Sequence, residues 1–110
     1  MTDLNAKAAE CLEFRKAGNF KENTIPSYYS GKQFVCYVSE WQPTKDIAQA
    51  WMLVEKCHEL GYHVEIKYWD DMLECGVYGE WNLRLGWCTA KDIVAITAAC
   101  VEALEHEQTN

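Results

Sequence analysis

The sequence predicts an α/β fold: a single-domain, layered α-β-α sandwich with a largely antiparallel sheet of about four strands and three helices. Segments with the apolar period of a helix alternate with segments in which every second residue is apolar. The alternating segments of the second half follow one another across short turns, as in an antiparallel meander. The 110 residues provide one core and are too few for two. We therefore expect one domain over residues 1–110, with frayed ends at 1–2 and 106–110.

The first predicted element is a helix over residues 3–15. Thr2 or Asp3 is placed to cap it, and Gly18 is placed to end it. Its apolar residues recur at helical spacing and so share one face: Leu4, Ala8, Cys11 and Leu12.

A loop and a strand are predicted next. Residues 18–32 contain turn-forming residues without a clear period, which indicates a loop. Its tyrosines, Tyr28 and Tyr29, either cover the edge of the core or stack on a ligand. Residues 33–39 are rich in strand formers and apolar on both faces. That pattern predicts a central strand covered on each side.

The second half of the chain contains two further predicted helices and three strands. The helices are expected over residues 45–59 and 91–105, and the strands over 62–69, 73–78 and 81–86. The inner face of the first of these helices is expected to contain Ile47, Trp51, Val54 and either Cys57 or His58.

One short motif occurs twice, at residues 41–47 and 87–93. Each copy has a tryptophan, then a threonine, then Lys-Asp-Ile where a helix is expected to begin. Thr44 and Thr89 are predicted to cap these helices, because a hydroxyl oxygen at this position accepts a free backbone N–H. The aspartates that follow are favoured by the helix dipole.

These helix starts predict a site for a flat anion. Free N–H groups together with Lys45 or Lys91 suit a phosphate, and neighbouring tryptophans could stack on a base. Arg84 could pair with a pyrophosphate through two parallel hydrogen bonds. The alternative is that Trp41 and Trp87 are hydrophobic anchors that fix how the chain enters each helix. The predicted ligand-binding residues are Trp41, Thr44, Lys45, Trp69, Trp81, Arg84, Trp87, Thr89 and Lys91.

The charge and the cysteines exclude several classes of function. A net charge of −7 argues against binding of duplex nucleic acid, and it also suits an acidic surface aimed at a basic partner. The six cysteines lack C-x-x-C spacing, so we expect reduced thiols in a cytoplasm rather than disulfides or a metal site. No segment predicts a membrane span or a signal peptide. No catalytic motif or cofactor-binding loop is recognisable, so we expect no enzyme activity and no cofactor.

The second half of the chain resembles the phage ABA sandwich domain family, small proteins of tailed phages and prophages. The resemblance covers roughly residues 40–104. Many members of the family carry an arginine in the final helix, where this chain has small residues around 97–99. The residues that carry the resemblance are Trp41, Pro43, Thr44, Asp46, Ile47, Ala48, Ala50, Trp51, Val54, Glu55, Lys56, Gly61, Tyr62, Thr89, Ala95, Ile96, Ala98 and Ala99.

Two functions are therefore expected. The resemblance implies a phage-encoded accessory protein in the host-cell cytoplasm. Look-alikes among phage counter-defence proteins sequester cyclic ADP-ribose signals, which implies a similar function for this chain. In the first function a homo-oligomer binds and sequesters a small anionic ligand of the cyclic-nucleotide or ADP-ribose type without catalysis. In the second, the acidic chain is an inhibitor that blocks a host or defence protein, by nucleic-acid mimicry or through exposed aromatic residues. The sequence favours the first of these functions.

Overall fold

The computed structural model describes residues 3–109, so the expectations for residues 1–2 and 110 lie outside the described residues. No helix within this range is both long and apolar enough to cross a membrane. Three 3-10 turns interrupt the loops: η1 (Phe20–Glu22), η2 (Val38–Glu40) and η3 (Glu80–Asn82). The helices and strands are, in chain order, α1 (Leu4–Cys11), β1 (Arg15–Ala17), β2 (Ser27–Ser30), β3 (Gln33–Tyr37), α2 (Ile47–Glu59), β4 (His63–Trp69), β5 (Met72–Tyr78), β6 (Arg84–Ala90) and α3 (Val94–Thr109).

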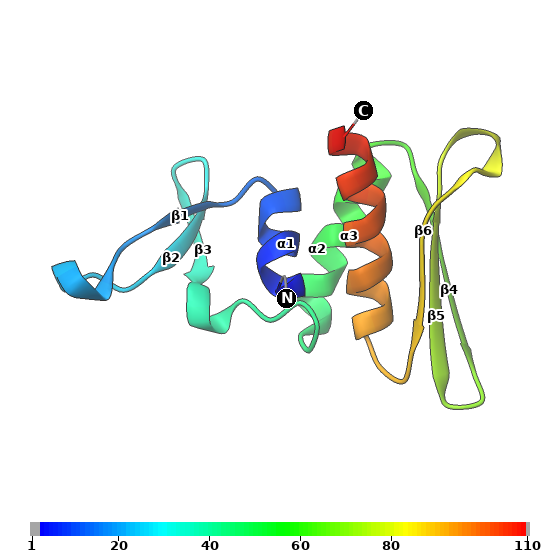
Figure 1. The fold of residues 1–110 in the computed structure, drawn as a ribbon, viewed down its shortest axis with the longest axis horizontal. Helices are drawn as coiled ribbons and strands as arrows, with labels where there is room; N and C mark the ends of the chain where they lie inside the picture. The colour runs from blue at the N-terminus through cyan, green and yellow to red at the C-terminus, as the bar shows by residue number, and fades with distance from the viewer. Residues whose placement is uncertain (1–2, 110) are drawn as a thin grey trace.

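The described strands form two antiparallel sheets with the three helices between them (Figure 1). The N-terminal sheet has the order β1-β2-β3, and the C-terminal sheet has the order β4-β5-β6. The predicted layered α/β class with antiparallel strands and three helices is confirmed. The strands number six in two sheets rather than about four in one, because parts of the predicted first helix and loop pair with β3 or with each other.

The first helix ends earlier than predicted. Asp3 caps it as expected, accepting the backbone N–H of Asn5 at 3.0 Å. After Cys11 the backbone turns left-handed at Glu13 (φ 61°), whose N–H donates to the carbonyl of Glu10 at 2.9 Å. Phe14 donates to the carbonyl of Ala9, which completes a Schellman-type end. The chain then enters β1, so Gly18 does not end the helix.

The third strand is confirmed, but it is not central. β2 occupies the centre of the N-terminal sheet, and β3 lies at its edge. One side of β3 packs toward the helices through Val35 and Cys36. On the other side aromatic rings pack on one another, with Phe34 and Tyr37 at 5.3 Å between ring centroids. Both faces of β3 are therefore apolar, although only one of them is covered by the helices.

The predicted inner face of α2 is confirmed at Val54 and Cys57 and is wrong at Ile47 and Trp51. Ile47 and Trp51 are exposed, whereas the helix is buried through Ala50, Leu53, Val54 and Cys57. α2 packs against α3, whose contact surface is rich in alanine and cysteine. Small side chains allow two helices to approach closely, and the indole of Trp51 would hold them apart.

α3 forms the centre of the molecule and contacts the C-terminal sheet as well as α1 and α2. It continues to Thr109, beyond the predicted end near residue 105 and through the expected frayed tail. The buried hydroxyl of Thr97 donates to the carbonyl of Pro43 and ties α3 to the segment before α2. Its buried residues occupy most of its circumference: Ala95, Ile96, Thr97, Ala99, Cys100, Val101, Ala103 and Leu104.

The buried cysteines are part of the core. All six cysteines are free thiols, and four of them are buried. Burial, reinforced by Glu105, raises the pKa of Cys11 to about 11. Hydrogen bonding to Cys57 and Cys75, together with burial, raises the pKa of Cys100 well above its usual range. Because the thiolate is the reactive form, Cys11 and Cys100 are expected to be inert at neutral pH.

Candidate functional site

The two predicted threonine caps are wrong. Asp46 caps α2, and its carboxylate accepts a backbone N–H of the first turn at 3.1 Å. Thr44 lies two residues earlier, outside the helix. Thr89 lies in β6, and Asp92 instead accepts a backbone N–H at the start of α3, at 3.0 Å. A carboxylate at a helix start adds charge to the same hydrogen bond, and so it is favoured over a hydroxyl.

Trp41 is a core residue. It is only 3% exposed, and its ring N–H donates to the carbonyl of Asn5 at 2.7 Å. Its indole packs against Phe14 at 5.1 Å and Tyr28 at 6.3 Å between ring centroids. The hydrophobic-anchor alternative therefore applies to Trp41, and Tyr28 covers the core.

Lys45 is exposed and lies just before α2, close to carboxylates. It lines a shallow hollow of about 480 Å³ together with Glu40 and Asp46. The backbone N–H of Thr44, which could have met a phosphate, donates to the side chain of Asn5 at 3.2 Å. Two carboxylates beside one lysine make this helix start a poor receptacle for an anion.

The other predicted residues belong to the C-terminal sheet and its connections. The guanidinium of Arg84 lies over the ring of Trp87 at 5.5 Å. Trp87 is paired with Gly76, and Thr89 with Glu74, on the sheet face that points away from α3. Trp69 ends β4, while Lys91 follows β6 and is exposed. The predicted site is thus divided between the start of α2 and this sheet.

Trp81 is almost fully exposed. It lies in η3, between β5 and β6, and is 97% exposed. Its backbone is left-handed, with φ 63°.

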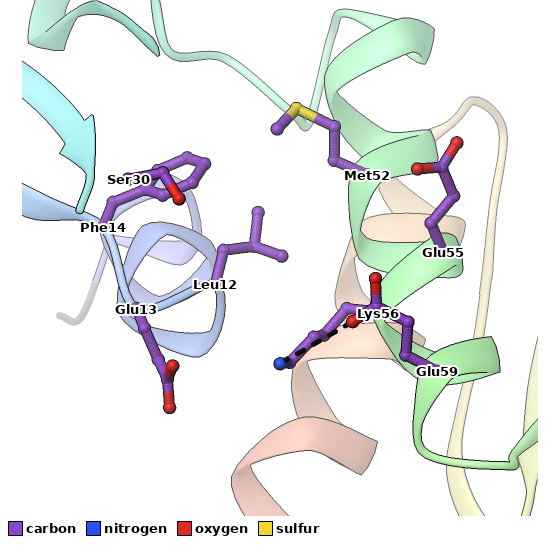
Figure 2. A pocket seen from close by; sticks show the side chains of 8 residues that line it. All are labelled: Leu12, Glu13, Phe14, Ser30, Met52, Glu55, Lys56 and Glu59. Carbon is purple, nitrogen blue, oxygen red and sulfur yellow. Dashed lines mark ion pairs between the residues drawn. The ribbon is translucent and has the colours of Figure 1, made fainter. Parts of the chain in front are cut away.

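The structure shows a cleft that the sequence did not predict, with a volume of about 320 Å³. It is formed by the end of α1, the end of β2 and one face of α2 (Figure 2). Its apolar part comes from Leu12, Phe14 and Met52. Figure 2 shows Lys56 reaching from α2 toward α1, with its Nζ 3.9 Å from Oε2 of Glu59. The full lining is Leu12, Glu13, Phe14, Ser30, Met52, Glu55, Lys56 and Glu59.

The cleft is acidic. Three glutamates line it against a single lysine, and that lysine is engaged with Glu59. Neither Glu13 nor Glu55 forms an ion pair with any residue in the range 3–109. Two carboxylates at the rim are therefore free to meet a cation from outside.

The backbone at Glu13 is strained. Its φ of 61° occupies the position after the helix end where glycine is usual, since only glycine adopts this conformation without steric cost. We expect Glu13→Gly to raise the free energy of unfolding by about 0.5–1 kcal/mol, measured by urea denaturation.

The matched control for this substitution is Glu10→Gly, three residues earlier inside α1. There the backbone is helical, so glycine is expected to destabilise by about 1 kcal/mol. If both substitutions lowered the free energy of unfolding, the left-handed conformation of Glu13 would carry no energetic cost.

This cleft has little signal in the sequence. Glu13 and Glu55 are far apart in the chain, and only the fold brings their elements together. The one local signal is Glu55 and Glu59 at i and i+4, a like-charge pair that isolated helices disfavour. A second surface was also missed: an aromatic row on the N-terminal sheet, in which Arg15 lies over Tyr29 at 4.9 Å.

Within residues 3–109, no group of three or more His, Cys, Asp or Glu side chains is arranged to hold a metal ion. Comparisons of the chain with protein-family models, curated proteins and solved structures find no match. The resemblance to the phage family stays a prediction based on the sequence.

Proposed function

We propose that this chain is a non-catalytic binding protein whose acidic cleft takes up lysine or arginine side chains of a basic partner protein. The observation that supports this proposal is the composition of the cleft, which is lined by three glutamates as well as by the apolar residues Leu12, Phe14 and Met52. Of the two functions expected from the sequence, the geometry favours the acidic inhibitor.

The cleft matches the chemistry of a long cationic side chain. The methylene stem of a lysine packs on apolar residues while its ammonium group stays at a polar rim. Leu12, Phe14 and Met52 offer the apolar surface, and Glu13 and Glu55 offer the carboxylates. Lys56 already occupies part of the cleft in this manner, so a partner's cation would compete with it for Glu59.

The net charge of −7 supports the same class of partner. An acidic protein attracts a basic one over a distance and raises the rate of encounter, more strongly at low salt. Proteins that grip nucleic acid carry clustered lysine and arginine. A host or defence protein of this kind, blocked at its basic surface, is the partner we propose.

A second candidate function is the sequestration of an anionic ligand. The observation that favours it is the stack of Arg84 on Trp87, with Thr89 further along the same strand. An indole and a guanidinium side by side suit a nucleotide. The face of the Trp87 ring that Arg84 covers, however, is not available for stacking with a base. Trp41, Thr44 and Lys45 have no part in this version of the site.

The cleft is tested by titrating the protein with a short lysine-rich peptide in a calorimeter at low ionic strength. We expect binding that weakens as salt is added, because the attraction is between charges. Glu13→Gln and Glu55→Gln are each expected to weaken binding about twofold to fivefold, since both carboxylates are exposed and screened.

The controls separate the cleft from general charge attraction. The same peptide with acetylated lysines should not bind, since acetylation removes the charge and keeps the stem. Glu22 lies in η1, between β1 and β2, and does not line the cleft. Glu22→Gln therefore removes the same charge outside the cleft and should leave the affinity for the peptide unchanged. Equal losses at Glu22 and Glu13 would contradict the proposal. A rise in melting temperature with ADP-ribose or a cyclic nucleotide, absent from Trp87→Ala, would favour the second candidate.

A further inference from the structure

β4 is an unpaired edge of the C-terminal sheet. The sheet has the order β4-β5-β6, and β4 pairs only with β5 among the described residues. Its seven residues form a strand that presents one complete row of backbone groups to the outside. Two apolar side chains of this strand are also uncovered: Ile66 is 39% exposed and Tyr68 is 69% exposed. Such an edge favours addition of another strand.

The sequence of β4 is complementary to itself when it is read in the opposite direction about Ile66. In an antiparallel pair of two copies centred there, Ile66 faces Ile66 and Val64 faces Tyr68. Glu65 of each copy then faces Lys67 of the other, so two opposite charges meet twice across the pair. All seven residues of the strand are paired in this register. A shift of the centre to Val64 or Tyr68 leaves residues unpaired and breaks both charge pairs.

The backbone of β4 fits the same register. The two-residue turn Asp70-Asp71, with φ 45° and 61°, joins Trp69 to Met72, which face each other across the hairpin. In such a turn the flanking residues bond to each other, and the direction of the backbone groups then alternates along the strand. The groups that face the free edge are therefore those of Tyr68, Ile66 and Val64.

These are the residues whose backbone groups an antiparallel pair centred on Ile66 requires. The intervening pairs of Glu65 with Lys67 then fall at non-hydrogen-bonded positions, where opposite side chains lie closest. Side-chain charge and backbone direction thus select one register independently.

At the opposite edge of the sheet, β6 has one backbone donor that is already occupied by a side chain of α3. The backbone N–H of Trp87 in β6 donates to Oε2 of Glu102 in α3, at 3.4 Å. Further growth of the sheet on that side is opposed, and a pair of identical strands related by a two-fold axis closes on itself. We infer that two copies of this chain pair antiparallel through β4, about Ile66, and form a continuous six-stranded sheet. This inference does not depend on the proposed cleft.

The charge pairs are tested by sedimentation equilibrium of the wild type and two single variants. The wild type is expected to be a dimer. In Glu65→Lys, a lysine faces Lys67 of the second copy twice, and in Lys67→Glu the two facing groups are both glutamates. Each variant is expected to dimerise about tenfold more weakly or worse. An equimolar mixture of the two should restore dimerisation, since opposite charges face each other again in the mixed pair.

Two further measurements test whether the dimer contact lies at β4. Lys32→Glu, in the turn between β2 and β3, changes charge equally away from β4 and should dimerise like the wild type. Amide hydrogen exchange of the wild type should slow with concentration at Val64, Ile66 and Tyr68. A wild type that is monomeric at every concentration tested would overturn the inference. So would a dimer that Glu65→Lys leaves unchanged, or one whose protected amides lie outside β4.

Discussion

Gly86→Ala is expected to lower the free energy of unfolding by about 3 kcal/mol or more. Gly86 lies in β6 directly against α3, and a methyl group there would collide with the carbonyl oxygen of Ala99 and approach the backbone nitrogen of Ala103 at 3.0 Å. These are backbone atoms of the central helix, so no side chain can turn aside to make room. In most strands alanine is at least as favourable as glycine, and the expected loss therefore measures the collision.

A matched control lies on the neighbouring strand. Gly76 of β5 faces the other side of the sheet, where an added methyl group would meet the ring of Tyr78, its nearest atom at 2.7 Å. That ring can rotate away, so Gly76→Ala is expected to cost less than about 1.5 kcal/mol. Urea denaturation of both variants makes the comparison. Similar losses at the two glycines would mean that α3 can shift away from β6 and that the layers are less tightly packed than the structure indicates.

Elements with a strong local pattern were predicted correctly. The hairpin of β4 and β5 follows from alternation on both sides of a two-residue turn, and α2 and α3 follow from their helical periods. β1 and β2 could not be predicted in this way. β1 has three residues and β2 has four, and neither carries a pattern of its own. They are strands because β3 provides a partner for β2, which in turn provides one for β1.

For the predicted site, the sequence likewise indicated local structure but not the contacts between distant segments. The repeated motif correctly marked two places where the chain approaches a helix. It could not show that Trp41 would meet Phe14 and Tyr28, because those contacts join segments brought together only by the fold. Trp87 precedes the same Lys-Asp-Ile residues but lies in a strand and remains partly exposed. Similar local sequences thus have different surroundings, and only the surroundings decide whether a tryptophan is an anchor of the core or is accessible to a ligand.

Trp41→Ala is expected to lower the free energy of unfolding by about 3–5 kcal/mol, because the indole is buried between Phe14 and Tyr28 and its removal leaves a large cavity. This is a large part of the total stability of a small domain, about 5–15 kcal/mol, so a substantial unfolded fraction is expected on mild heating. Thermal and urea denaturation followed by circular dichroism measure the change.

Two further tryptophan variants decide what the loss at Trp41 means. Trp41→Phe keeps a ring in the core but leaves the carbonyl of Asn5 without the indole N–H, so we expect a smaller loss of about 1–3 kcal/mol. Trp81→Ala removes the same side chain where it is 97% exposed and should change stability by less than about 0.5 kcal/mol. A tryptophan held ready for a ligand would give no such difference in stability: Trp41→Ala would fold as well as Trp81→Ala and lose only ligand affinity. The order of the three stabilities therefore tests whether Trp41 is an anchor of the core or part of a site.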